Sequence, residues 1–214
     1  MIDIAVVDYG MGNLRSVSKA LEHVAPDKQV LVTSDPLQID AAERVVFPGQ
    51  GAMPDCMREL DARGLRDAVV RAAASKPFLG ICIGLQLLFE RSEEGDAAGL
   101  GILPGKVIKF AKDQMHDAVG HKLKVPHMGW NQVYQVMKHP MWQNIPDAER
   151  FYYVHSYYVV PRNQECIAGY SEYPARFTSA VAQDNIFAVQ FHPEKSQHAG
   201  LQLLSNFAQW NGRA

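Results

Sequence analysis

Short apolar runs alternate with segments of helical period in the first half of the chain. Four such runs predict buried strands over residues 2–8, 29–33, 44–47 and 77–81. Apolar positions at helical spacing predict helices over residues 14–24, 54–74 and 83–91. Asn13 is placed to cap the first helix, Gly64 to break the second, and Pro48-Gly49 to end the third strand. Strands that alternate with helices favour a parallel sheet covered on both faces.

The second half of the chain is dominated by short segments rich in Val, Tyr, Phe and Ile. They predict strands, some of them antiparallel, over residues 106–110, 130–136, 151–160, 166–173, 177–183 and 186–191. A last helix follows Ser196, its candidate cap, and the polar stretch 112–125 predicts a surface loop. We therefore expect one α/β domain over residues 1–214, with a mostly parallel mixed sheet flanked by helices and additional antiparallel strands.

Composition narrows the class of protein. The 214 residues are 47% apolar and 21% charged, which fits a globular domain with a large core. The 21 basic and 23 acidic residues give a net charge of -2, which argues against a nucleic-acid-binding face. No apolar run is long enough to span a membrane, and the first ten residues lack the basic lead of a signal peptide. Cys56, Cys82 and Cys166 form no CxxC pair, so we expect no disulfide and a cytoplasmic protein.

Two patterns point weakly to other ligands. Gly10-Met11-Gly12 follows the first strand as in a dinucleotide-binding turn, but Arg15 stands where the third glycine should be. A tight turn is the better interpretation. Three histidines gather near the predicted surface loop, at His116, His121 and His127. Without a nearby cysteine or a carboxylate fixed on a strand, they are interpreted as solvated loop residues rather than metal ligands.

The strongest local signal is Gly80-Ile81-Cys82-Ile83-Gly84, where a buried strand meets a helix. The GxSxG elbow of hydrolases uses the same arrangement to hold a nucleophile in an exposed, strained turn. The glycines remove Cβ clashes, and a helix that starts after Cys82 favours the thiolate. A buried structural cysteine is the alternative. We interpret Cys82 as a candidate nucleophile.

A thiolate nucleophile needs a base, and His192 follows the apolar run that ends at Phe191. Pro193 pushes His192 toward an extended backbone, in which residues two apart project to the same side. Glu194 can therefore hold one ring nitrogen while the other faces sulfur, as the third member of a catalytic triad does. The alternative is a strand-end turn with a solvated carboxylate. Cys82, His192 and Glu194 form the predicted triad.

Acyl transfer also requires hydrogen-bond donors for a developing oxyanion. The N–H of Ile83, which directly follows the candidate nucleophile, is one candidate. The second is the backbone at Gln50 and Gly51, because the glycines on both sides of Gln50 let this peptide reorient toward a ligand. An ordinary turn at the end of the third strand is the alternative for this loop.

Taken in order, these motifs resemble a known family. PGQGAM from Pro48, GICIGLQ from Gly80 and FHPEKS from Phe191 resemble class I glutamine amidotransferases, which have a flavodoxin-like fold and a Cys-His-Glu triad. DYGMGNLRSV from Asp8 and VPHMGWN from Val125 narrow the resemblance to the glutaminase subunits of imidazole glycerol phosphate synthase. The resemblance runs essentially end to end.

The resemblance implies a reaction and a set of roles. Cys82 would attack the side-chain amide of glutamine to give a glutamyl thioester and ammonia, and water would then release glutamate. Neither a metal nor a cofactor is implied. Positions that match substrate-pocket residues of the family are Gln86, Glu94, His155, Ser156 and Tyr157. For Glu94 and Tyr157, an ordinary surface acid and a core aromatic residue remain the alternatives.

A glutaminase with no synthase domain in its own chain implies a docked partner that receives the ammonia. In the family this partner is a (β/α)8-barrel cyclase subunit, which makes imidazole glycerol phosphate and aminoimidazole carboxamide ribotide in histidine biosynthesis. Positions that match the partner face are Asn13, Met128, Trp130 and Lys195. Gln50 departs from the family pattern, in which valine is frequent. We expect neither nucleic acid nor membrane among the partners.

Two other functions compete with this interpretation. The nearest is a glutaminase of the same fold that serves pyridoxal phosphate, anthranilate or purine synthesis, against which the VPHMGWN and HPEKS motifs argue. The other is a non-catalytic flavodoxin-like module that uses Cys82 as a redox sensor. It would leave the joint occurrence of Cys82, His192 and Glu194 as a coincidence.

Overall fold

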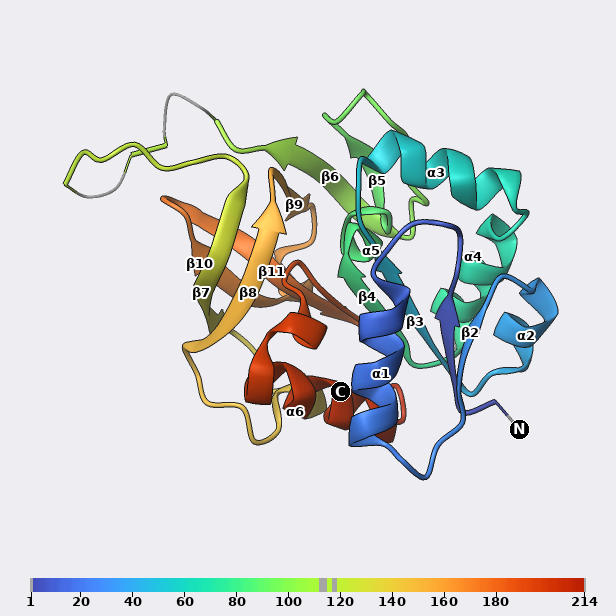
Figure 1. Ribbon diagram of the computed structural model, residues 1–214. Coiled ribbons are helices and arrows are strands. Elements are labelled where there is room, and N and C mark those ends of the chain that lie inside the picture. Colours follow the sequence, from blue (N-terminus) through green and yellow to red (C-terminus); the bar gives the residue numbers. More distant parts are fainter. Residues whose placement is uncertain (1, 112–114, 117–118, 214) are drawn as a thin grey trace.

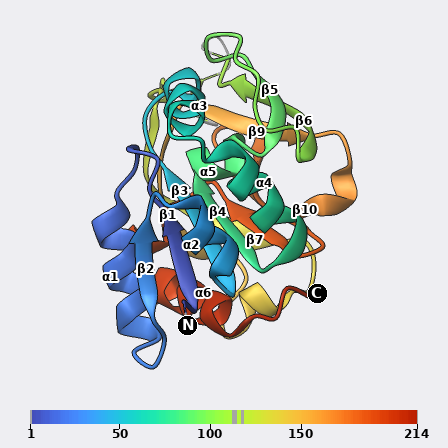
Figure 2. The same ribbon diagram turned by 90° about the vertical axis from the view of Figure 1, so that its right-hand side faces the viewer.

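A computed structural model describes residues 2–111, 115–116 and 119–213 of the chain. Within this part, the strands join into one mixed sheet, with helices packed on the faces of its parallel half (Figures 1 and 2). The buried apolar side chains form one continuous cluster. No helix of the described ranges has the length and apolar character needed to cross a membrane. The expected α/β architecture is confirmed.

The parallel half of the sheet has the order β2-β1-β3-β4-β12. Its strands are β1 (Ile4–Val7), β2 (Val30–Thr33), β3 (Arg44–Gly49), β4 (Phe78–Cys82) and β12 (Ile186–Val189). Every residue of β1, β3, β4 and β12 is buried. These strands are covered on both faces, which is why each reads as a continuous apolar run rather than as an alternating one.

The antiparallel half continues from β12 in the order β11-β10-β7-β8. It consists of β7 (His127–Gln135), β8 (Glu149–His155), β10 (Ile167–Glu172) and β11 (Arg176–Gln183). A branch pairs β9 (Tyr157–Pro161) with β11 and with β6 (Leu103–Lys109), which in turn pairs with β5 (Phe89–Ser92). The expectation that part of the second half is antiparallel is therefore confirmed.

Helices cover both faces of the parallel half. On one face α1 (Leu14–Val24) lies against α6 (Gln197–Gln209), and on the other α2 (Pro36–Ala41) lies against α4 (Arg66–Ser75) (Figures 1 and 2). Helices α3 (Met53–Ala62) and α5 (Ile83–Gln86) follow the carboxyl ends of β3 and β4. Three 3-10 turns complete the described chain: η2 (Pro140–Trp142), η3 (Gln164–Cys166) and η4 (Pro193–Lys195).

Several predicted boundaries are wrong. The helix expected over 83–91 ends at Gln86, and the chain then enters β5. Leu87, Leu88 and Phe89 are fully buried, so the apolar pattern could not separate a short helix from a strand. The expected break near Gly64 is confirmed, since α3 and α4 flank it with Gly64 at a φ of +66°.

Other differences concern caps and strand ends. Pro48-Gly49 does not end the third strand, because β3 continues through Gly49 and pairs there with Cys82 of β4. Asn13 precedes α1 without a capping hydrogen bond from its side chain. Helix α2 was not predicted, although Asp35 caps it by accepting a hydrogen bond from the N–H of Leu37. In the loop expected over 112–125, residues 112–114 and 117–118 lie outside the described part.

One difference shapes the site. The single strand expected over 151–160 is divided at Ser156 into β8 and β9. These two strands pair with different partners, β7 and β6, so the chain changes direction at this residue. The division brings the backbone at 155–157 to the edge of the sheet where β3 and β4 also end. The carboxyl ends of parallel strands are where open α/β sheets bind ligands.

Candidate active site

Cys82 lies on a sharp turn at the carboxyl end of β4. Its φ of 56° and ψ of -109° are strained for a residue with a side chain, as in a nucleophile elbow. A Cβ on Gly84 would overlap the carbonyl oxygen of Phe47, and one on Gly80 would approach the Cβ of Ala188 to 2.9 Å. Both glycines are therefore required by the close packing of β4 and α5 against β3 and β12. Helix α5 is a single turn, so a helix dipole at Cys82 is smaller than the sequence suggested.

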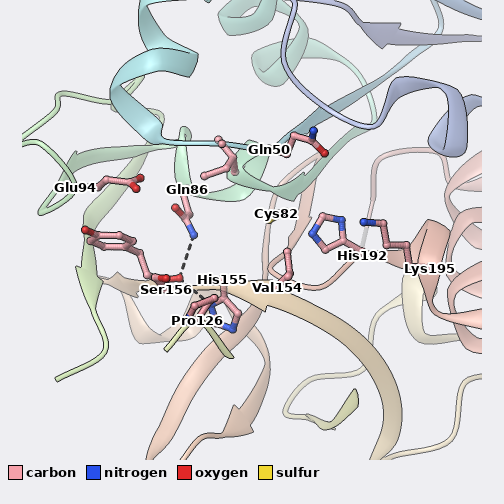
Figure 3. A pocket seen from close by; sticks show the side chains of 13 residues that line it. Gln50, Cys82, Gln86, Glu94, Pro126, Val154, His155, Ser156, His192 and Lys195 are labelled. Atoms are coloured by element: carbon pink, nitrogen blue, oxygen red, sulfur yellow. Dashed lines mark hydrogen bonds between the residues drawn. The ribbon is translucent and has the colours of Figure 1, made fainter. Parts of the chain in front are cut away.

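His192 and Glu194 meet as the sequence predicts. Nδ1 of His192 donates to Oε1 of Glu194 across 2.9 Å, and both side chains are nearly inaccessible to solvent. The other ring nitrogen, Nε2, is turned toward Cys82 (Figure 3). Burial alone would lower the pKa of His192, but interactions with Cys82 and then Glu194 outweigh it and raise the pKa to about 10. The raised pKa favours the protonated ring. Nε2 is buried without a hydrogen-bond partner among the described residues, so it can donate to the sulfur or to a leaving group.

Ser196 fixes the backbone of this base rather than a helix end. Its hydroxyl donates to the carbonyl of His192 across 2.6 Å and accepts from the N–H of Tyr152 across 2.9 Å. The N–H of His192 in turn donates to the carbonyl of Tyr152. The expectation that Ser196 caps the last helix through its side chain is wrong, since that hydrogen bond is absent at α6.

Two buried glutamines hold hydrogen bonds around the sulfur. Nε2 of Gln86 donates to the carbonyl of Tyr157 and to Oε1 of Gln190, across 3.1 and 3.0 Å. Nε2 of Gln190 donates to Sγ of Cys82 across 3.8 Å. Oε1 of Gln86 is buried and has no hydrogen-bond partner among the described residues, so it is free to accept from a ligand.

Sequence reasoning missed Gln190, although a signal was present. Gln190 lies two residues before His192 at the end of an apolar run, and it is completely buried. A polar side chain at such a position has to find hydrogen-bond partners in the interior. In an extended segment it also projects to the same side as His192.

A cavity of about 260 Å³ opens above Cys82. Figure 3 shows Cys82 between Gln86 and His192, with Glu94 at one end of the pocket and Lys195 at the other. The structure thus brings together nearly all of the predicted triad, oxyanion and substrate residues. The lining includes Gln50, Gly51, Cys82, Ile83, Gln86, Glu94, His155, Ser156, Tyr157, His192 and Lys195.

Two parts of the pocket wall are held by contacts with α3. Oε2 of Glu94 accepts a hydrogen bond from the N–H of Met53, in the first turn of α3. The carbonyl of Gln50 accepts from the thiol of Cys56, across 3.5 Å, and Gly51 has a φ of +101°. Glu94 therefore presents a carboxylate at the pocket wall, and the loop at Gln50 has a conformation that only glycine adopts readily at position 51.

The remaining predicted partner-face residues lie outside this pocket. Met128 and Trp130 are on the same side of β7 and are 63% and 44% exposed, unusual values for such large apolar side chains. Asn13 precedes α1 and is half-buried. Lys195, in η4, is exposed and is the one member of the set that also lines the pocket.

The interpretation of His127 from the sequence is wrong. It is not a solvated loop residue but the first residue of β7, and its ring is buried. Its Nδ1 lies 3.0 Å from Nε2 of His155. The strand begins earlier than the apolar pattern indicated because His127 pairs with His155 across β7 and β8. Among the described residues, no cluster of three or more His, Cys, Asp or Glu side chains could hold a metal ion.

The sequence of the chain is similar to those of known proteins. Residues 5–210 match the sequence model of the family described as glutamine amidotransferase class-I. The chain is 68% identical over 210 residues to the imidazole glycerol phosphate synthase subunit HisH of Aromatoleum aromaticum, which covers 98% of this chain and 99% of that one. It is 69% identical over 210 residues to the subunit of the same name from Thiobacillus denitrificans, covering 98% and 92%.

Solved structures support the fold. The glutaminase domain of CTPS from Trypanosoma brucei, with bound acivicin, superposes with a TM-score of 0.66 at 19% identity, covering 99% of this chain and 95% of that one. A crystal structure described as glutamine amidotransferase gives a TM-score of 0.68 at 16% identity, covering 96% and 99%. Fold, elbow geometry and sequence agree, and the chain belongs to the class I glutamine amidotransferase family.

Proposed function

We propose that this chain is the glutaminase subunit of an imidazole glycerol phosphate synthase, which releases ammonia from glutamine for histidine biosynthesis. The observation that carries the proposal is the strained elbow at Cys82, which faces the buried His192–Glu194 pair at a pocket of about 260 Å³. The relatives that match over nearly the full chain bear the name of this synthase subunit. That agreement favours it over glutaminases of other pathways and over a sensor module.

The proposed reaction starts from the charge arrangement at the triad. The sulfur of Cys82 attacks the side-chain amide carbon of glutamine, and protonated His192 gives its Nε2 proton to the departing ammonia. The product is a glutamyl thioester. His192, now neutral, takes a proton from water as that water attacks the thioester carbon, and glutamate leaves. Glu194 keeps the ring oriented throughout through its bond to Nδ1.

Charge also develops on the amide oxygen in both steps. We propose that the N–H of Ile83 and the backbone at Gln50 and Gly51 donate to this oxyanion, because these residues line the pocket beside the sulfur. The unpartnered Oε1 of Gln86 accepts a hydrogen bond from the substrate. The carboxylate of Glu94, at the far end of the pocket, suits an α-ammonium group.

Further proposals concern substrate, partner and location. Ser156 and Tyr157 complete the glutamine pocket at the division between β8 and β9. The partner is a cyclase subunit, which we propose is a (β/α)8 barrel that forms a heterodimer with this chain. The exposed pair Met128 and Trp130, with Asn13 and Lys195, would form the contact face. We also propose that residues 1–214 act as one glutaminase domain in the cytoplasm, where such a biosynthetic step takes place.

The decisive experiment separates glutamine-dependent from ammonia-dependent synthesis in the complex with a cyclase subunit. Cys82→Ala should abolish synthesis from glutamine and leave synthesis from ammonium salts intact, because only the ammonia source is lost. Cys166→Ala is the matched control, since this thiol is also free and buried but lies outside the pocket. Normal glutamine-dependent turnover by Cys82→Ala would overturn the proposal.

A further inference from the structure

His127 has no place in the proposed chemistry, yet it is surrounded by specific contacts. Its imidazole is 3% exposed and stacks on the ring of Tyr173 at a centroid distance of 3.9 Å. Nδ1 lies 3.0 Å from Nε2 of His155, and Nε2 lies 3.4 Å from the side-chain nitrogen of Asn131. Both ring nitrogens of a buried residue are thus engaged. His127 does not line the pocket itself.

The geometry allows only one direction for these hydrogen bonds. Nδ1 of His155 lies 2.8 Å from the carbonyl oxygen of Tyr157, which can only accept, so the proton of His155 is on Nδ1. Nε2 of a neutral His155 must then accept, and Nδ1 of His127 must donate to it. Nε2 of His127 is left to accept from the amide of Asn131. Burial supports the neutral state, since it lowers the pKa of His127 to about 4 and that of His155 to about 3.

The chain of hydrogen bonds ends at the pocket. The carbonyl of Tyr157, which accepts from His155, also accepts from Nε2 of Gln86 across 3.1 Å. This carbonyl belongs to the first residue of β9, next to the division at Ser156, and both residues line the cavity. Its position therefore determines where the free Oε1 of Gln86 points. A shift of the carbonyl would move a hydrogen-bond acceptor that is aimed at the substrate.

We propose that His127 is a positioning residue for the glutamine pocket. By donating from Nδ1 to His155, it fixes the carbonyl of Tyr157 and, through that carbonyl, the amide of Gln86. The proposal rests on the proposed glutaminase function for its kinetic readout. It assigns a role in substrate binding to a side chain that lies one layer behind the pocket wall.

Two substitutions separate the hydrogen bond from the packing. In His127→Asn, the amide nitrogen is attached to Cγ, as Nδ1 is, so it can still donate to His155. In His127→Gln, the amide is one bond further out, near the former Nε2, so it can meet Asn131 but loses the bond to His155. Both variants lose the ring that stacks on Tyr173, so both should lower the thermal midpoint to a similar extent.

The readout is the KM for glutamine and the kcat of glutamate release, measured with the cyclase subunit and its nucleotide ligand. His127→Gln should raise KM about tenfold over His127→Asn, as expected for one lost buried hydrogen bond, with a smaller change in kcat. His139→Gln is the control: this buried histidine contacts Phe187 and Trp210 rather than the pocket, so it should lower stability alone. Equal KM values for the two His127 variants would assign His127 to packing and overturn the proposal.

A measurement on the unchanged protein covers the case in which the variants do not fold. Long-range ¹H–¹⁵N correlation spectra distinguish the two neutral tautomers of histidine. We expect His127 and His155 to be neutral at pH 7 with the proton on Nδ1, and a proton on Nε2 of either ring would overturn the proposal. A wild-type complex that releases no glutamate would instead defeat the proposed function and leave the tautomer result untouched.

Discussion

The side-chain amide of Gln190 donates a hydrogen bond to the sulfur of Cys82 across 3.8 Å. The same side chain accepts from Gln86 through its oxygen, so one buried amide joins the nucleophile to the proposed substrate-binding glutamine. A donor at this position stabilises negative charge on the sulfur before the substrate arrives. Because Gln190 is completely buried, water cannot replace it when it is removed.

Gln190→Leu should therefore slow both chemistry and alkylation of Cys82. The variant keeps the approximate volume but removes the donor to sulfur and the acceptor for Gln86, and we expect roughly a tenfold loss in kcat/KM. Gln190→Glu keeps the acceptor but places a carboxylate beside the sulfur, so its loss should be larger. The check is the rate at which iodoacetamide modifies the peptide that contains Cys82 at pH 7. A wild-type rate in both variants would show that this contact has no influence on the sulfur.

Much of the fold was accessible from the sequence because its parallel half is buried on both faces. Runs such as 45–47 and 78–81 then carry no polar side chain, and the alternation with helices follows directly. The predicted end of the helix after Cys82 was wrong because Leu87, Leu88 and Phe89 are buried on all sides. Leu87 and Leu88 form a turn, and only the pairing of β5 with β6 decides that the chain continues as a strand from Phe89.

The candidate site also has residues that the sequence predicts and one that it does not. The elbow and the His192–Glu194 pair depend on local spacing, which a motif records. His127, by contrast, is buried by partners far along the chain, His155 and Tyr173, that nothing near position 127 announces. Its assignment to a solvated loop failed because a lone histidine between polar and apolar neighbours carries no local signal of burial.

The protein should lose stability in mild acid because three histidines are buried in the neutral form. Burial lowers the pKa of His127 and His139 to about 4 and that of His155 to about 3, whereas an unfolded histidine has a pKa of about 6.5. Between these values the unfolded state binds more protons, so stability is present above about pH 6.5 and is lost as the pH falls toward 4. At about 1.4 kcal/mol per pKa unit, each group contributes on the order of 3 to 5 kcal/mol.

His192 acts in the opposite direction. Its pKa is raised to about 10, so its contribution is complete below about pH 6.5 and is lost as the pH rises through 10. Urea midpoints at pH 4.5, 6.5 and 9 should therefore peak near pH 6.5, with the steeper fall on the acid side. His139→Gln should flatten the acid limb, because it removes one of the three groups. A midpoint that stays constant from pH 6.5 to 4.5 would contradict the assignment of neutral buried rings.

Lys195→Glu should weaken binding of the partner subunit. Lys195 is exposed beside the mouth of the pocket and directly follows Glu194, so its charge is available for an acid across the interface. The effect should shrink as ionic strength rises, because screening shortens the range of such a pair. Lys138→Glu, a charge reversal at another exposed lysine away from the pocket, is the control. Equal dissociation constants for the wild type and Lys195→Glu at low salt would remove Lys195 from the contact face.

The loop at Gln50 should limit the activity of the isolated chain. Gly49 pairs with Cys82 in the sheet, and a Cβ there would overlap the hydroxyl of Tyr9, so the start of the loop is fixed. The carbonyl of Gln50 is held by the thiol of Cys56, and Gly51 follows with a φ of +101°. A backbone donor in this loop reaches the oxyanion only if the peptide is correctly turned, and losing one such donor costs on the order of 100- to 1,000-fold in turnover.

We expect the chain alone to release glutamate slowly, and the complex with cyclase and nucleotide ligand to be faster by about that factor. A ligand that favours the competent loop by about 3–4 kcal/mol would suffice.

Gly51→Ala should then lower kcat in the liganded complex by a similar factor, because alanine resists this φ and its Cβ would approach Met11 to 2.9 Å. Gly64→Ala has the same kind of backbone strain, at a φ of +66° with no atom within 4 Å of the new Cβ, but lies between α3 and α4. It should cost stability without changing kcat. If Gly51→Ala turns over like the wild type, or if the chain alone matches the liganded complex, the loop at Gln50 is an ordinary turn and the oxyanion is stabilised elsewhere.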